Sequence, residues 1–220
     1  MLYDLILQPL LSHWRLVAFA GVILIGLRIL RAPAVKGWIG EWHVNRGLRK
    51  LDGGQYQLFH DLYLPRPDGK GTTQVDHVVV SPFGVFVVET KNYRGWIFGT
   101  ETQRQWTQQI FRRKEKFQNP LHQNKLHVRA LMELLRLPES AVRPVVIFIG
   151  DAVFKTKMPE NVLSRGLGRW IGKHQEVLLD ADEVQRVSAA LAAHDRATDR
   201  EVVARQHVRD LIQRGEKVGK

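Results

Sequence analysis

The chain of 220 residues contains no cysteine. Disulfide bonds and thiolate metal sites are therefore excluded, and the absence fits a reducing compartment. The histidines do not replace the missing thiolates, because His43, His77, His122 and His127 show no spacing typical of zinc ligands. Internal repeats, low-complexity segments and a glycine-rich phosphate loop are also lacking, since Gly-Leu-Gly at residues 166–168 has none of the remaining fingerprint of a nucleotide site.

Acidic residues are outnumbered by basic ones. The chain has 22 Asp and Glu against 33 Lys and Arg, which gives a net charge of +11. Such a surplus suits a polyanion, either nucleic acid or an anionic membrane surface, and net charge does not separate these two. A basic solvated surface is the third interpretation. The hydrophobic content of 44% is ordinary for a globular protein, and the length allows one core with appendages.

Charged residues are scarce near the N-terminus. Leu16–Leu27 is uncharged and almost wholly apolar, and Leu5–Leu30 is interrupted chiefly by His13, Arg15 and Arg28. We expect one membrane-spanning helix, with membrane contact over residues 10–30, because a span needs about 20 apolar residues and arginine can reach the interface from its ends. The positive-inside bias then places everything after residue 31 in the cytoplasm. A buried or interfacial helix is the alternative, since the uncharged stretch is short.

The most informative stretch is a strand–turn–strand pattern at residues 73–90. Two apolar runs, residues 73–80 and 85–90, flank a Ser-Pro-Phe-Gly turn, so the pattern predicts a hairpin. The hairpin would fold Asp76, near the head of the first run, back beside Glu89 and Lys91 at the tail of the second. Glu89 and Lys91 are two residues apart and should therefore point to the same face.

Two carboxylates and an amine at a strand end are what a Mg²⁺-dependent phosphodiester-cleaving site needs. Asp76 and Glu89 would supply carboxylate ligands and the Thr90 carbonyl a third oxygen, because Mg²⁺ prefers oxygen and keeps several waters. Lys91 would orient the attacking water or stabilise the transition state. Glu41, on a preceding helix, would bind a second metal or a metal-bound water. The alternative is a cross-strand salt bridge between Lys91 and Asp76 or Glu89.

Hydrophobic periodicity along the rest of the chain predicts an α/β domain with a mixed sheet. We expect helices at residues 40–51, 120–135, 182–193 and 199–214, with Glu41 in the first turn of the first helix. Further strands are expected at residues 56–64, 105–110, 145–149 and 177–179, and residues 96–99 should extend the hairpin's sheet. The strand at 145–149 reads as buried and parallel. The predicted divisions are a membrane anchor and linker (1–35), a nuclease-like domain (36–150) and an α/β extension completing or packing on it (151–220).

A basic cluster follows the hairpin. It surrounds two aromatic residues, Phe111 and Phe117, and consists of Arg104, Arg112, Arg113, Lys114 and Lys116. This cluster is the candidate for phosphate contacts with nucleic acid, and a solvated face is the alternative.

The remaining aromatic residues and histidines are expected to be structural. We place Trp96, Phe98 and Trp106 in the core. His77 should point to the opposite face of its strand from Asp76. His122 and His127 are five residues apart on a helix and share no good face.

Asp76 followed by Glu89-Thr-Lys91 resembles the Asp…(Asp/Glu)-x-Lys core of the restriction-endonuclease-like nucleases. More closely, the chain resembles the nuclease-related domain (NERD) family over residues 40 to about 150. The resemblance rests on four segments in order: Gly-Glu-x-x-Val at 40–44, residues 74–93 of the hairpin, Gly-Trp-Ile-Phe-Gly at 95–99, and Gln-Asn-Pro-Leu-His-Gln-Asn at 118–124.

The resemblance implies an α/β, restriction-endonuclease-like mixed β-sheet flanked by helices. It places Asp76, Glu89 and Lys91 at the metal centre, suggests Glu41 as an accessory acid, and adds Gln123 as a polar helix residue near the site. We therefore expect a membrane-anchored nuclease that uses Mg²⁺ or Mn²⁺ and acts on DNA. The alternative is a catalytically inactive nucleic-acid-binding or membrane-associated adaptor module with the same fold.

Overall fold

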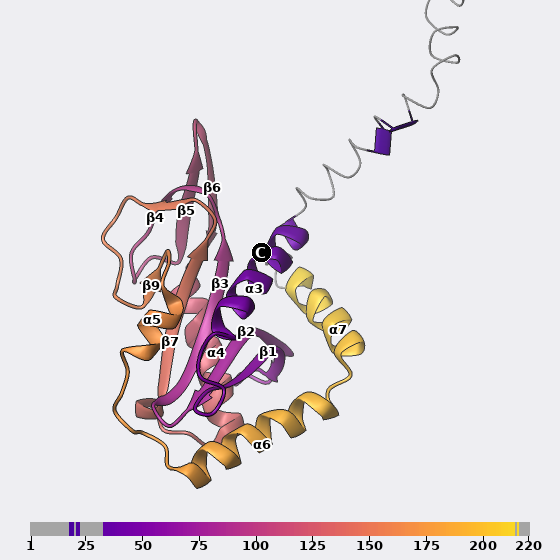
Figure 1. Ribbon diagram of the computed structural model, residues 1–220. Coiled ribbons are helices and arrows are strands. Elements are labelled where there is room, and N and C mark those ends of the chain that lie inside the picture. Colours follow the sequence, from indigo (N-terminus) through magenta and orange to yellow (C-terminus); the bar gives the residue numbers. More distant parts are fainter. Residues whose placement is uncertain (1–17, 20, 23–32, 214, 216–220) are drawn as a thin grey trace, which may run out of the picture.

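The structure is a computed structural model that describes residues 18–19, 21–22, 33–213 and 215 (Figure 1). In this part of the chain no helix has the length and apolar character needed to cross a bilayer. The expected span at residues 10–30 lies almost wholly outside the described residues and stays a prediction.

The larger of two sheets has five strands in the order β1-β2-β3-β7-β9. Neighbours β1, β2 and β3 are antiparallel, whereas β3–β7 and β7–β9 are parallel. The predicted hairpin is confirmed as β2 and β3, whose valine-rich sequences favour strands. The bounds are β1 Gln57–Pro65, β2 Thr72–Ser81, β3 Gly84–Asn92, β7 Val142–Ile149 and β9 Val162–Leu163.

The second sheet has four strands in the order β6-β5-β4-β8. Its bounds are β4 Gly95–Phe98, β5 Gln105–Ile110, β6 Arg113–Gln118 and β8 Ala152–Phe154. The expectation that residues 96–99 extend the hairpin's sheet is therefore wrong. Gly95 has a φ of 80°, and a Cβ there would collide with the Gln109 carbonyl. This conformation, which glycine adopts readily, turns the chain away from β3 and toward β5.

Helices cover both faces of the five-stranded sheet (Figure 1). On one face, α3 and α5 pack against β2, β3 and β7. On the other face, α4 and α6 pack against β1, β2 and β3. The bounds are α3 Pro33–Leu48, α4 Pro120–Leu135, α5 Leu167–Gly172, α6 Ala181–Ala197 and α7 Arg200–Gln213. The sequence analysis placed Glu41 in the first turn of its helix, but α3 begins at Pro33, so Glu41 lies in the middle of the helix. Proline is tolerated at a helix start.

Helix α4 matches its predicted bounds, 120–135. The Asn119 side chain accepts a hydrogen bond from the Leu121 amide at 2.9 Å and so caps the helix, and Pro120 suits the first turn. At the other end, Arg136 adopts a left-handed conformation that stops the helix. These local signals explain why this helix could be read from the sequence.

The prediction of a strand at residues 177–179 is wrong. The amides of Leu178 and Leu179 both donate to one carbonyl, that of Pro82, so the segment makes no ladder with the sheet. Residues after 150 nevertheless join the main fold, since they supply β9 to the larger sheet and α6 to its core.

The expected aromatic core is only partly present. Trp106 is fully buried and stacks on Phe148, with ring centroids 6.0 Å apart. Phe98 is half-buried. Trp96 is 47% exposed, and the Lys155 ammonium lies 4.5 Å from its ring centroid, so its placement in the core was wrong.

Candidate functional site

Strands β2 and β3 separate in the middle of the larger sheet. Their pairing ends at His77 opposite Val88. Beyond that point β2 continues along β1 and β3 continues along β7, each to its end. Asp76 and Glu89 are the first residues past the last pair. The two strands thus form a fork, and each of its prongs carries an acidic residue.

Asp76 turns into this fork. Val75 and Val78 are three residues apart, so regular alternation along a strand would put their side chains on opposite faces. Both side chains nevertheless lie in the core on the α4 side, so the alternation of β2 breaks at Asp76. The break lies beside Asp61 of β1, which has a φ of 57°. Asp76 is 1% exposed, and its Oδ2 accepts a hydrogen bond of 2.7 Å from the Thr90 amide. This bond connects the prongs where the ladder has ended.

Glu89 and Lys91 lie on one face of β3, as their spacing predicts. The Lys91 Nζ is 2.7 Å from the Glu89 Oε1, and Glu89 is fully buried. Lys91 also donates a hydrogen bond of 2.9 Å to the Oε1 of Gln123 on α4. The salt bridge between Lys91 and Glu89 that the alternative interpretation allows is therefore present, and both of its partners lie on β3. Asp76, Glu89, Lys91 and Gln123 come together around the fork.

His127 of α4 is the member of this site that the sequence analysis missed. Its Nε2 lies 3.0 Å from the Glu89 Oε2, and its Nδ1 lies 2.8 Å from the Thr73 hydroxyl oxygen. A carboxylate only accepts, so Nε2 donates to Glu89. The signal in the sequence was the spacing of four residues from Gln123, which puts both side chains on one helix face. The sequence analysis compared His127 only with His122, five residues away, and so did not consider its spacing from Gln123.

A buried asparagine fixes α4 over the fork. The Asn124 side-chain amide donates to the Val87 carbonyl at 3.0 Å and to the Val145 carbonyl at 3.1 Å. These carbonyls belong to the neighbouring strands β3 and β7. The side chain is 1% exposed, so loss of these bonds would leave polar groups buried. Asn124 thereby sets the position from which Gln123 and His127 reach the site.

Glu41 lies on the other side of the sheet from Gln123 and His127. It is half-buried on α3, and its backbone carbonyl accepts a hydrogen bond of 3.2 Å from the His77 Nε2. His77 thus faces α3 and has the structural contact expected of it. Among the residues that the structure describes, no three or more His, Asp or Glu side chains converge as a metal-binding group.

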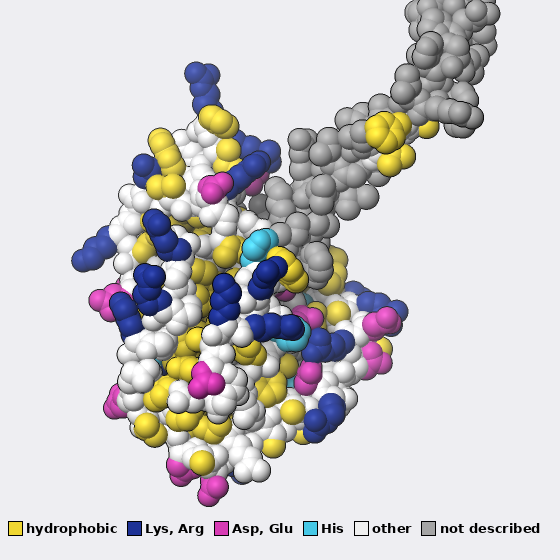
Figure 2. All heavy atoms as spheres, in the orientation of Figure 1, with side chains coloured by type: hydrophobic (Ala, Val, Ile, Leu, Met, Phe, Trp, Pro, Cys, Tyr) yellow, Lys and Arg dark blue, Asp and Glu magenta, His cyan; other side chains and the backbone are white. Residues whose placement is uncertain are grey.

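The basic cluster lies on and beside the β5–β6 hairpin of the second sheet. Arg113, Lys114 and Lys116 lie on β6, a strand the sequence analysis did not predict; Arg112 is in the β5–β6 loop and Arg104 just before β5. All five are exposed, and Arg113 pairs with Glu115. Figure 2 shows Lys and Arg side chains at the end of this hairpin and along the face below it.

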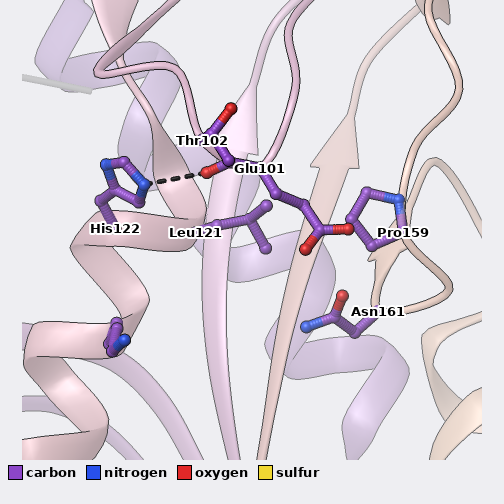
Figure 3. Close-up of a pocket in the computed structure, with 7 residues that line it drawn as sticks. Glu101, Thr102, Leu121, His122, Pro159 and Asn161 are labelled. Carbon is purple, nitrogen blue, oxygen red and sulfur yellow. Dashed lines mark hydrogen bonds between the residues drawn. The ribbon is translucent and has the colours of Figure 1, made fainter.

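A separate hollow lies beside α4. Its volume is about 360 Å³, and the His122 Nε2 donates to the Glu101 carbonyl at its rim, at 2.9 Å (Figure 3). Its α4 residues occupy the helix face away from Gln123 and His127, so the hollow is not part of the fork. The lining residues are Glu101, Thr102, Leu121, His122, Lys125, Pro159 and Asn161.

A mixed sheet between helices, with an Asp and a Glu-x-Lys at the fork of its central strands, defines a protein of the restriction-endonuclease-like superfamily. Within it, the chain belongs to the NERD family: the model of the nuclease-related domain matches residues 36–149. An uncharacterized protein of Bacillus anthracis is 50% identical over 166 residues, which cover 70% of this chain and 74% of that protein. No solved structure matches. Family membership indicates a nuclease-related function with nucleic acid as the partner.

Proposed function

We propose that this protein is a metal-dependent nuclease that hydrolyses DNA phosphodiester bonds at the β2–β3 fork. The observation that carries the proposal is the burial of Asp76, Glu89 and Lys91, which are 1%, 0% and 5% exposed, where two central strands part. Burying ionised groups is costly, and apolar residues of similar volume often give equal or greater stability. Function is therefore a better reason than stability for charges at this position.

The donors at the fork suit Mg²⁺ or Mn²⁺. The proposed ligands are the carboxylates of Asp76 and Glu89 and the carbonyl of Thr90. Glu41 would serve a second ion or a metal-bound water from the α3 side of the sheet, opposite Gln123 and His127. The Asp76 and Glu89 carboxylates are almost completely buried on the two prongs of the fork, so the donors that the fork offers are oxygen atoms. Mg²⁺ commonly takes one or two carboxylates and completes its shell with water and phosphate. A bound ion would polarise the phosphate and acidify a bound water.

Lys91 is held as a cation aimed at the site. The amine contacts the Glu89 carboxylate and the Gln123 side-chain carbonyl, and both of these groups only accept hydrogen bonds. The geometry therefore favours the protonated amine. In this form Lys91 can orient the attacking water and offset the charge that develops on the phosphate. Gln123 fixes the position of the amine, and His127 fixes the Glu89 carboxylate from the other side.

A cleavage assay tests the site. The full chain in detergent micelles would be incubated with plasmid, linear duplex and single-stranded DNA, with Mg²⁺, Mn²⁺ or EDTA. We expect metal-dependent cleavage that Asp76→Ala and Lys91→Ala abolish. Lys125→Ala, which removes an exposed lysine from the outer face of α4, is the matched control and should cleave normally. Cleavage that persists in both site variants would refute the assignment.

We also propose that residues 10–30 anchor the protein in a membrane with the nuclease domain in the cytoplasm. The support is the apolar composition of this stretch and the positive residues that follow it. Carbonate extraction of cells that express the chain with and without residues 1–35 tests the anchor. Release of the complete chain by carbonate would contradict it.

A second candidate is a nucleic-acid-binding module that keeps the fold without catalysis. The specific observation in its favour is that both Glu89 oxygens are already engaged, Oε1 by Lys91 and Oε2 by His127. A metal ion would have to compete with these partners. Calorimetric titration with Mn²⁺ separates the two candidates, because the binding module would give no heat that depends on Asp76.

A further inference from the structure

The β5–β6 hairpin extends beyond the body of the molecule (Figure 1). Its strands pair from Gln105 opposite Gln118 to Ile110 opposite Arg113. Only Phe111 and Arg112 remain to form the loop. The tip is therefore as tight as an antiparallel hairpin allows, and the residues at the tip are presented on a rigid ribbon.

Phe111 is an unusual residue for this position. It is 93% exposed and has a φ of 52°. Tight hairpin loops favour glycine, asparagine or aspartate where φ is positive, because other side chains are strained there. Packing does not offset this strain, since the ring is almost completely in solvent. A bulky residue kept in a strained conformation indicates a use outside the fold.

The surroundings of the ring are cationic and rich in carboxamides. Arg112, Arg113, Lys114 and Lys116 are exposed on the loop and on β6, and the one acid on that strand, Glu115, is paired with Arg113. On β5, Gln105 and Gln109 share one face of the ribbon, and the Gln109 side chain holds the tip by donating to the Phe111 carbonyl at 2.9 Å. Gln108 lies on the other face, where its side chain donates to the Arg94 carbonyl at 2.8 Å. Figure 2 shows hydrophobic side chains among Lys and Arg at this end of the molecule.

This combination fits duplex nucleic acid better than a lipid surface. A two-stranded ribbon can enter the minor groove, where proteins use arginine, lysine and glutamine side chains at the base edges. Arginine and lysine contact phosphates, and DNA-bending proteins insert apolar wedges between base steps. A bilayer would use the ring and the cations but has no comparable role for the carboxamides that Gln105 and Gln109 carry on one face of the ribbon.

We propose that the β5–β6 hairpin is the DNA-binding arm of this protein, in which Phe111 is the wedge that unstacks a base step while Arg112, Arg113 and Lys114 hold the flanking phosphates. The proposal rests on the proposed function for its partner, DNA, and is independent of whether the fork is catalytic. It assigns to Phe111 a role in distorting the duplex.

Binding in EDTA tests the arm without cleavage. The full chain in detergent micelles would be titrated into a labelled duplex that contains 2-aminopurine, whose fluorescence rises when it unstacks. Phe111→Gly should weaken binding about 10-fold, in line with the loss of one base–aromatic contact, and should abolish the fluorescence rise. Phe111→Trp should retain both. Val177→Gly removes another exposed apolar side chain, 67% exposed in a loop, and should bind normally.

Folding does not confound the result, because glycine suits a positive φ and Phe111→Gly should keep or raise the unfolding temperature. Unchanged DNA binding by Phe111→Gly would overturn the proposal. So would unchanged DNA binding together with weaker binding to phosphatidylserine vesicles, which would make the tip a membrane contact. If Asp76→Ala and Lys91→Ala both still cleave DNA, the proposed function fails, but weaker binding by Phe111→Gly in EDTA would still support the arm.

Discussion

Replacing Lys91 by methionine removes the cation at the fork but keeps most of its aliphatic length. The Glu89 carboxylate, fully buried and 2.7 Å from the amine, then loses its lysine partner. Removing one partner of a buried ion pair costs about 3–5 kcal/mol. Because the His127 Nε2 stays 3.0 Å from the same carboxylate, we expect a loss near the lower end, about 3 kcal/mol.

The double variant Glu89→Gln with Lys91→Met gives a sharper expectation. With both charges gone no buried ion is left with a missing partner, so the double variant should be more stable than the Lys91→Met single variant. Urea unfolding in EDTA of the native protein, Lys91→Met, Glu89→Gln and the double variant gives the free energies of the cycle, and a difference of about 3 kcal/mol corresponds to a midpoint shift of roughly 1 M or more. The double variant should be folded and inactive.

Repeating the urea unfolding series in Mn²⁺ tests whether the proposed metal ion binds the folded protein at the fork. An ion that binds only the folded state at 100 times its dissociation constant adds about 2.7 kcal/mol, so Mn²⁺ should stabilise the native protein and not an Asp76→Ala variant. The reasoning would be refuted if Lys91→Met cost less than about 1 kcal/mol, the value typical of an exposed pair. Strict additivity of the two single variants would refute it equally.

The structure makes three further predictions. Asn119→Ala removes the cap of α4 and the amide that donates to the carbonyls of residues 100, 101 and 103. It should lower the unfolding free energy, measured in urea, by about 2 kcal/mol or more, and a loss under about 0.5 kcal/mol would contradict this. Burial, and secondarily the charge of Asp52, raises the pKa of the Tyr56 phenol, so this group's contribution to stability is full below its ordinary pKa of about 10 and is lost as pH rises past it. Between pH 8 and 10.5 the unfolding free energy of Tyr56→Phe should therefore fall less than that of the native protein. Equal losses would show that the Tyr56 pKa is not raised by folding. Arg113→Ala with Lys114→Ala should reduce the slope of log K against log salt for DNA binding by about 2, whereas an unchanged slope would remove both residues from the interface.

Local pattern explains which parts of the fold could be predicted. The β2–β3 hairpin and α4 were readable because their turn and cap residues and their apolar spacing agree with the final structure. Strand β6 was not readable: its sequence Arg-Lys-Glu-Lys-Phe-Gln has no apolar alternation, and it is a strand because it pairs with β5. The short strands β8 and β9 likewise exist through their partners.

The sequence by itself determined that Asp76, Glu89 and Lys91 would meet, because a tight hairpin and a two-residue repeat leave few other arrangements. Only the tertiary structure decided how they meet. The separation of β2 from β3, the placement of α4 by Asn124 and the arrival of His127 at Glu89 depend on segments up to 38 residues apart in the chain. Spacing within one segment can put Gln123 and His127 on one helix face. It does not say which strands that face meets, since this is fixed by the packing of helix on sheet.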